Sequence, residues 1–210
     1  MPLNILLKNE VNKNIKVKSY ILRGISPSGH VDIQELFYLS LSKPKFRKHL
    51  MERSFNDDET FNSLLRRANL LYKLDTLPQG TLFELWTYFL IKKFFEYFNI
   101  DGEVYRNLNV EYNGKSITEI DIVARVNNNL YIFECKDRNI TLNMLLKFYG
   151  IVKLLNQDIG VMATTKIFCG NLEKEEISEE FNIFILDKVL EKDENKIFKE
   201  LREIFKLTEG

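Results

Sequence analysis

The sequence predicts an α/β domain in which helices cover both faces of a mixed central sheet. Three observations favour this class. The 210 residues are enough for one such domain with a smaller appendage. Segments with helical and strand periodicity alternate from residue 81 onward. Apart from Glu134, residues 130–135 are apolar on both faces of a strand, which is typical of a central strand covered on each side.

The composition is that of a globular protein without a marked net charge. Hydrophobic residues make up 45% and charged residues 29%, and 30 Lys and Arg balance 30 Asp and Glu, so any basic surface has to be local. The two cysteines are expected to stay reduced, and two histidines leave little material for zinc or Ser-His-Asp chemistry. The apolar run near the N-terminus is too short for secretion or a membrane span, so a cytoplasmic protein without a membrane partner is expected.

Residues 1–77 are expected to form a mostly helical N-terminal region with a role in substrate or partner recognition. Its expected elements are a strand within 15–22 and helices over 33–42, 45–53 and within 57–74. Pro44 opens the second helix, and Asp57 or Asp58 caps the third. The segment "DTLPQG" then breaks the chain, and a second unit follows over 78–210.

The second unit has the predicted order αβββαβ, followed by αβα. Its elements are a helix over 81–98, strands over 103–112, 117–126 and 130–136, a helix over 141–156, a strand over 159–165, an acidic helix over 171–180, the strand "NIFIL" and a terminal helix over 187–206. The triplet "YNG" marks a turn between the first two strands.

Charged side chains end the strand that otherwise looks buried. Glu134 and Lys136 are two residues apart and therefore share a face. Asp121 of the preceding strand reaches that face if the loop between the strands has two residues, which sets Asp121 opposite Glu134, or four residues, which sets it opposite Lys136. A three-residue loop would turn Asp121 to the other face, so an even register or a compensating bulge is predicted.

Two carboxylates one strand spacing apart repel each other unless a cation lies between them. Mg²⁺ binds one or two carboxylates together with water and phosphate oxygens, and a neighbouring lysine can orient water or stabilise charge on phosphate. Asp121, Glu134 and Lys136 thus fit metal-assisted phosphodiester hydrolysis. The alternative is a structural ion pair of Lys136 with Asp121 or Glu119.

A third acid, Glu84, lies on the helical stripe of Tyr88, Ile91 and Phe95. This stripe is expected to face the sheet, which would direct Glu84 toward the metal site. Thr81 and Glu84 also have the spacing of a capping box at the start of a helix. The two interpretations are not exclusive.

These residues resemble the PD-(D/E)XK nuclease superfamily, whose fold is restriction-endonuclease-like with an αβββαβ core. The helix with Glu84, then Asp121 and the E-x-K element "ECK" occur in that order. The segment "LLKFYGIVKLL…IGVMATTKIF…ISEEFNIFILDKVL" is similar to Mrr-type restriction enzymes and archaeal Holliday-junction resolvases. "LPQGTLFELWTYFLIKKF" with "EIDIVARVNNNLYIFECK" is similar to nuclease domains of CRISPR ancillary effectors. The resemblance covers about residues 80–190.

The resemblance implies roles for individual residues. Asp121, Glu134 and the main-chain carbonyl of Cys135 would hold Mg²⁺ or Mn²⁺, Lys136 would assist the attacking water, and Glu84 would orient the metal shell, directly or through water. Lys147 and Tyr149 would meet the phosphate backbone, although "KFYG" departs from the Gln and Tyr that the family often has there. The Cys135 thiol is expected to be a core group, not a nucleophile.

A basic segment, "SKPKFRKHLMER", supplies further candidates for phosphate contact. They are Lys43, Lys45, Arg47 and Lys48. The alternative for this segment is a solvated helix face. The acidic segment "LEKEEISEE" is expected to lie away from the substrate.

The expected function is therefore that of a Mg²⁺- or Mn²⁺-dependent endonuclease in restriction, defence or DNA processing, which cuts DNA in preference to RNA and could act as a homodimer. One alternative is a dimeric enzyme like the Holliday-junction resolvases. Another is a nucleic-acid-binding or assembly subunit that keeps the fold without hydrolysis.

Overall fold

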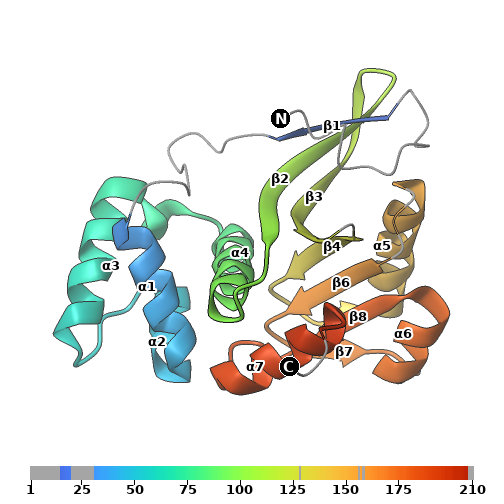
Figure 1. The fold of residues 1–210 in the computed structure, drawn as a ribbon. Coiled ribbons are helices and arrows are strands. Elements are labelled where there is room, and N and C mark those ends of the chain that lie inside the picture. Colours follow the sequence, from blue (N-terminus) through green and yellow to red (C-terminus); the bar gives the residue numbers. More distant parts are fainter. Residues whose placement is uncertain (1–14, 20–30, 128, 156, 158, 208–210) are drawn as a thin grey trace.

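The computed structural model describes residues 15–19, 31–127, 129–155, 157 and 159–207. The predicted α/β class, with a mixed sheet between helices, is confirmed (Figure 1). The apolar run near the N-terminus and the end of the predicted strand segment 15–22 lie outside the described residues.

The N-terminal part contains one strand and three helices, close to the predicted positions. Their bounds are β1 Ile15–Ser19, α1 Val31–Ser42, α2 Pro44–Glu52 and α3 Glu59–Tyr72, followed by a 3-10 turn at Leu74–Thr76. Helix α2 begins at Pro44, because the fixed φ of proline suits the first helical position. The Asp58 carboxylate caps α3 by accepting a hydrogen bond from the Phe61 N–H at 2.9 Å.

The remaining elements follow the predicted order. They are α4 Gln79–Tyr97, β2 Gly102–Tyr112, β3 Lys115–Val126, β4 Asn129–Lys136, β5 Ile140–Thr141, α5 Leu142–Leu154, β6 Ile159–Thr164, β7 Phe168–Cys169, α6 Lys174–Phe181, β8 Ile183–Leu186 and α7 Glu194–Ile204. Thr141 caps α5 as expected. The short β5–β7 pair was not predicted, and α7 begins later than residue 187 because Asp193 caps it.

The main sheet has six strands in the order β1-β2-β3-β4-β6-β8. Strands β1 to β4 pair antiparallel, whereas β4, β6 and β8 run parallel. Helices α4 and α7 cover one face, and α5 and α6 cover the other (Figure 1). The carboxyl ends of β4 and β6 therefore open beside α4.

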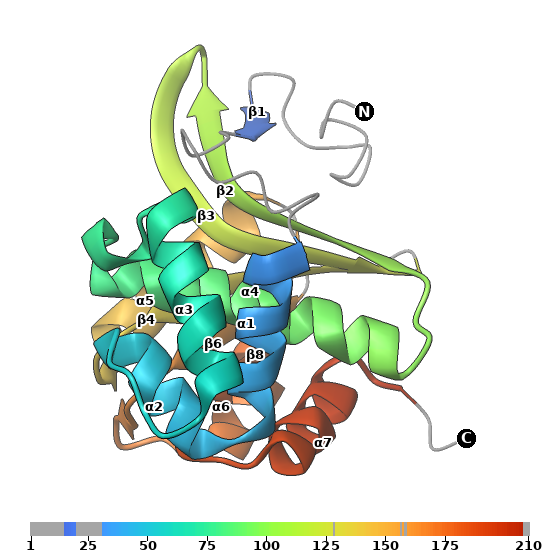
Figure 2. The same ribbon diagram turned by 90° about the vertical axis from the view of Figure 1, so that its left-hand side faces the viewer.

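Helix α4 lies between the sheet and the N-terminal helices α1, α2 and α3 (Figures 1 and 2). Eleven of its residues are buried, on all sides of the helix. Side chains of α1–α3, α4, α7 and the strands form one continuous apolar cluster. Because α4 is enclosed in this way, its few polar side chains sit in a low-dielectric setting.

Arg47 was predicted to contact phosphate, and this prediction is wrong. The side chain is fully buried on the inner face of α2. Its guanidinium donates hydrogen bonds to the carbonyls of Ser40 at 3.2 Å, Leu41 at 2.6 Å and Val189 at 3.0 Å, and to that of Lys192. Burial lowers the pKa of Arg47 to about 10, so the group stays charged at neutral pH. Arg47 joins α1 and α2 to the segment before α7.

Replacing Arg47 by Met is expected to lower the free energy of unfolding by about 3 kcal/mol, because several buried carbonyls lose their donor at roughly 1–3 kcal/mol each. Chemical denaturation followed by circular dichroism measures the change. The matched control is Lys48→Met on the exposed face of the same helix, for which a change within about 0.5 kcal/mol is expected. Equal effects of the two substitutions would contradict the structural role of Arg47.

Candidate active site

The loop between β3 and β4 fixes the position of Asp121. Val126 pairs with Asn129, which leaves a two-residue loop, and Ile122 pairs with Phe133. Asn127 has a φ of 55°, which suits a tight hairpin turn. The predicted even register is thus confirmed, and the next position in register sets Asp121 opposite Glu134. The Asp121 carboxylate accepts a hydrogen bond from the Cys135 N–H at 2.7 Å, across the two strands.

Lys136 lies on the same face of β4 as Glu134 and forms an ion pair with it. The predicted alternative was an ion pair of Lys136 with Asp121 or Glu119. Lys136 does form an ion pair, but its partner is Glu134, so the predicted partners are wrong. Burial by itself would lower the pKa of Lys136, but the charges of Glu134 and then Asp121 outweigh it and hold this pKa above its usual value. The ammonium group is therefore charged and held between carboxylates.

Glu84 reaches this cluster from α4. The helix begins at Gln79, after Pro78, and no side chain caps it, so Thr81 lies within the first turn and the predicted capping box is wrong. Tyr88, Ile91 and Phe95 are buried on the predicted stripe, and Glu84 itself is half-buried. Burial raises the pKa of Glu84 to about 7, with a further contribution from Glu119 and Glu134, while Arg106 and Lys136 act in the opposite direction.

Asp121 carries the largest electrostatic cost in the cluster. Burial, then the charges of Glu134 and Glu84, raise its pKa to about 8, although the Cys135 N–H and Lys136 favour its ionised form. Asp121 and Glu84 therefore influence each other's titration. A divalent cation placed beside them would favour the ionised form of both carboxyl groups.

The donor set fits a hard cation such as Mg²⁺ or Mn²⁺. Among the described residues, no three His, Cys, Asp or Glu side chains form a ready-made metal cage. Mg²⁺ usually needs only one or two carboxylates, with water and phosphate oxygens completing its shell. Asp121 and Glu134, with the main-chain carbonyl of Cys135 as a third candidate ligand, are a set of that kind.

The Cys135 thiol points to the opposite face of β4 and is buried in the apolar cluster below α4. Burial raises the pKa of this thiol, and the charges of Asp121 and Glu84 raise it further. A thiol that stays protonated in this way is not a nucleophile. The prediction that Cys135 is a core residue is confirmed.

Two residues of the site were missed in the sequence. Arg106 of β2 lies opposite Ile122, and the pairing of β2 with β3 is interrupted at the next position, Asn107, which would face Asp121. Asn107 is buried and has a φ of 53°. A charged residue followed by Asn within an apolar strand was the available signal.

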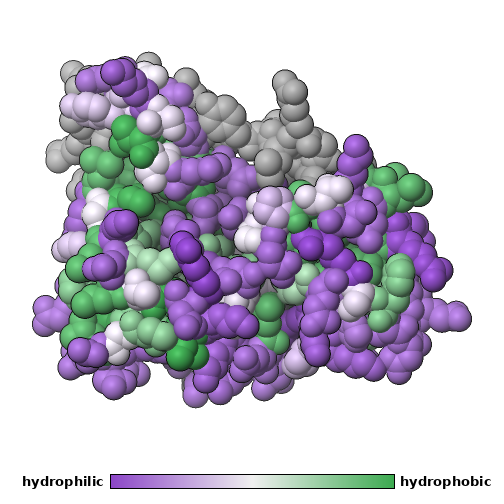
Figure 3. Space-filling model, turned by 180° about the vertical axis from the view of Figure 1, so that it is seen from behind, coloured by the Kyte–Doolittle hydropathy of each residue, from purple (hydrophilic) through white to green (hydrophobic). Residues whose placement is uncertain are grey.

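The predicted phosphate-contacting residues of α5 do not lie together. Lys147 is exposed, whereas Tyr149 packs its ring edge-on against Phe181 at 5.3 Å, below the Lys153 ammonium. Residues two apart on a helix point in different directions. Exposed Leu142, Leu146 and Leu154 share this helix, and apolar side chains gather on this side of the molecule when it is seen from behind (Figure 3).

The remaining basic candidates lie on the exposed side of α2. Lys43 stands 5.0 Å from the Phe46 ring, Lys45 pairs with Asp57 at 2.6 Å, and Lys48 lies 3.9 Å from Glu52. Lys45 and Lys48 line a cavity of about 780 Å³, whose other walls include Gln79 of α4 and the residues after β4 and β6. One of those residues is Asp137, directly after Lys136, and its carboxylate accepts a hydrogen bond from the Thr165 hydroxyl at 2.7 Å.

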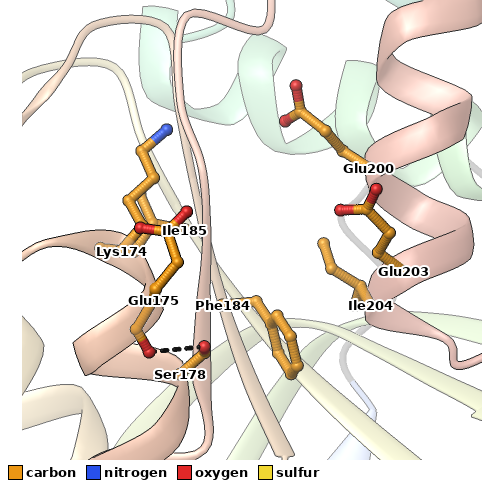
Figure 4. A pocket seen from close by; sticks show the side chains of 8 residues that line it. All are labelled: Lys174, Glu175, Ser178, Phe184, Ile185, Glu200, Glu203 and Ile204. Atoms are coloured by element: carbon orange, nitrogen blue, oxygen red, sulfur yellow. Dashed lines mark hydrogen bonds between the residues drawn. The ribbon is translucent and has the colours of Figure 1, made fainter.

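A second cavity, of about 320 Å³, lies between α6, β8 and α7 (Figure 4). Carboxylates from both helices face it: Glu175, Glu200 and Glu203. Such a lining repels a polyanion. The acidic helix α6 packs on β8, two strands away from β4 in the sheet.

Within the described part of the chain, no helix combines the length and apolar character needed to cross a membrane.

No protein-family model matches the chain. Protein VC1899 from Vibrio cholerae has a similar solved structure, with a TM-score of 0.59 and 13% identity over 92% of this chain and 59% of that protein. Can2 from Sulfobacillus thermosulfidooxidans, solved in complex with cyclic tetra-adenylate, gives a TM-score of 0.55 and 15% identity over 91% of this chain and 56% of Can2. These likenesses show a shared fold. The chain spans little more than half the length of either protein.

A closer relationship appears at the level of sequence. The uncharacterized protein MJ1664 of Methanocaldococcus jannaschii is 43% identical over 221 aligned positions, which cover 96% of this chain and 98% of that protein. Identity at this level along nearly the whole of both chains shows common descent, and the chain belongs to the family of MJ1664.

Proposed function

We propose that the protein is a Mg²⁺- or Mn²⁺-dependent endonuclease of the PD-(D/E)XK type that hydrolyses phosphodiester bonds in DNA in preference to RNA. The observation that carries the proposal is the convergence of Asp121, Glu134 and Lys136 on one face of the sheet, beside Glu84. Two of these acids have raised pKa values, as expected for carboxylates that await a cation.

In this proposal, different residues of the site have different roles in hydrolysis. Asp121, Glu134 and the Cys135 carbonyl would hold the ion, which when bound supplies positive charge against the attacked phosphate. Lys136, which is paired with Glu134, would orient the attacking water and stabilise charge that develops on the phosphate. Glu84 would orient the outer part of the metal shell from the side of α4.

The surroundings support a nucleic-acid substrate. Exposed Lys45 and Lys48 border the cavity that begins directly after Lys136, where they can contact phosphates without reading sequence. In this proposal residues 1–77 assist recognition, residues 78–210 carry the chemistry, and Lys43 and Lys147 add outer phosphate contacts.

The proposal predicts cleavage that depends on the site residues. Plasmid, linear duplex and single-stranded RNA are incubated with the protein and Mg²⁺ or Mn²⁺, and products are separated on gels. Glu134→Ala and Lys136→Ala are expected to lower the cleavage rate at least about 100-fold, because groups that bind the cation and stabilise the phosphate are lost. Chelation by EDTA should abolish cleavage by the wild type.

Matched controls are Glu180→Ala on α6 and Lys199→Ala on α7, both exposed and expected to leave the rate unchanged. Site variants as active as the wild type would remove the assignment of the site. A wild type that binds DNA and cleaves nothing would favour the non-catalytic binding subunit. A dimer in solution that prefers four-way junctions to linear duplex would favour the resolvase-like enzyme.

The raised pKa values also predict how stability depends on pH and metal. Asp121 and Glu84 have pKa values of about 8 and about 7 in the folded protein, against 3.8 and 4.5 as ordinary values. Between these two sets of pKa values, the metal-free folded protein binds more protons than the unfolded chain. The contribution of the two acids to the free energy of unfolding is therefore greatest below pH 4. It is lost as the pH rises through the folded-state pKa values of about 7 and about 8. Bound Mg²⁺ should offset the loss at pH 8.

Thermal unfolding of the EDTA-treated protein at pH 5 and pH 8 measures this effect. Asp121→Asn is expected to stabilise the metal-free protein relative to the wild type, and this gain should be larger at pH 8 than at pH 5. The difference between the two pH values should be about 1–2 kcal/mol, or roughly 2–8 °C in melting temperature. Mg²⁺ should raise the melting temperature of the wild type at pH 8 and have little effect on this variant. The control Asp101→Asn alters an exposed acid; a pH effect of the same size there would contradict the prediction.

A further inference from the structure

The cavity of about 780 Å³ lies where the parallel strands β4 and β6 end. Asp137 and Thr165, the residues that directly follow these strands, form one wall, and helix α2 forms another. In open α/β sheets, ligands bind in the crevice outside the carboxyl ends of the strands. The volume is also within the range of small-molecule sites. The cavity is therefore a candidate binding site, and it begins one residue after Lys136.

Hydrogen bonds hold the wall at the strand ends in place. The hydroxyl of Thr165, which is buried, donates to the Asp137 carboxylate at 2.7 Å. The Thr165 N–H donates to the Lys136 carbonyl at 3.3 Å. A carboxylate has two acceptor oxygens, so Asp137 can also accept a hydrogen bond from a ligand. Gln79 of α4 adds to the lining an amide that can both donate and accept.

The cavity also has an apolar part. Met51 of α2 is buried, and Leu190, between β8 and α7, is half-buried, and both line the cavity. A nucleobase needs apolar contact for its faces and hydrogen-bonding groups for its edge. Met51 and Leu190 can supply the first, and Asp137 and Gln79 the second.

The charges of the lining are balanced. They belong to Lys45, Lys48 and Lys166 on one side of the balance and Glu52, Asp137 and Glu191 on the other. Three acids make the interior unsuitable for a phosphate but not for a neutral base. All three lysines are exposed, and the ion pairs of Lys45 and Lys48 are exposed too. Such pairs contribute little, so a phosphate outside the cavity can replace the carboxylate partners of these lysines.

We propose that the cavity binds one unstacked nucleotide of the substrate strand, with the base inside and its phosphate at the exposed lysines. A base inside a duplex cannot enter, because its faces are stacked and its edge is paired. Strands with an unpaired nucleotide should therefore bind better than continuous duplex. This inference rests on the proposed function, since it places the bound nucleotide beside the phosphate that is cleaved.

Binding of fluorescein-labelled oligonucleotides in EDTA, followed by anisotropy, tests the proposal without cleavage. The probes are a thymidine oligonucleotide of about ten nucleotides, the same chain with abasic sites in place of all nucleotides but the last, and a duplex of equal length. The wild type is expected to bind the single-stranded thymidine probe about 10-fold more tightly than either of the others, since each base held on a protein surface contributes roughly 1–3 kcal/mol.

Gln79→Trp, which fills the cavity, should lower the affinity for the thymidine probe about 10-fold and leave the affinity for the abasic probe unchanged. Gln34→Trp on α1 is the matched control, because Gln34 is a half-buried glutamine outside the cavity; it should change neither affinity. Should Gln79→Trp not fold by circular dichroism, Gln79→Ala makes the same comparison with a smaller loss.

Equal affinities of the wild type for the thymidine and abasic probes would overturn the inference. So would a Gln79→Trp variant that loses affinity for both probes alike. Either result, together with Mg²⁺-dependent cleavage by the wild type, would leave the nuclease proposal standing. Base-dependent binding by a wild type that cleaves nothing would support the nucleotide site and defeat the nuclease proposal.

Discussion

The pairing of β3 with β4 is the constraint on which the candidate site depends. A two-residue loop sets Ile122 opposite Phe133 and so brings Asp121 to the side of Glu134 and Lys136. A slip of one residue would turn every side chain of one strand to the other face, which would take Ile122 out of its apolar cluster and place Asp121 there. The apolar cores on both faces of the sheet therefore hold the two carboxylates together, although no attraction exists between them.

The site is thus a place where folding works against local electrostatics. Asp121 and Glu84 are half-buried near a third acid. Within the described part of the chain, Lys136 and Arg106 are the cations that favour their ionised forms. Burial of like charges of this kind is destabilising for the metal-free fold. The large core around α4 can tolerate that cost, and structures retain such strained electrostatics chiefly where a bound ligand relieves it.

Much of this arrangement follows from the sequence, and the exceptions have physical causes. The register could be predicted because strand periodicity and two asparagines allow few loops. The capping box failed because Pro78 lets α4 start two residues earlier than Thr81. Arg47 was misjudged because its acceptors are main-chain carbonyls, two of them on a distant segment, and carbonyls leave no mark in a sequence. Arg106 was missed because the surroundings of its side chain depend on how α4 packs against β2.

Because α4 is enclosed, the N-terminal helices influence the geometry of the candidate site. Glu84 can meet Asp121 only if α4 is held tightly against the sheet, and the outer side of α4 is buried by α1, α2 and α3. Arg47 binds those helices to the segment that precedes α7, which lies on the same face of the sheet. Residues 31–77 complete the core around the helix that carries Glu84. A shift of α1–α3 would therefore change the geometry of the acids without touching any of them.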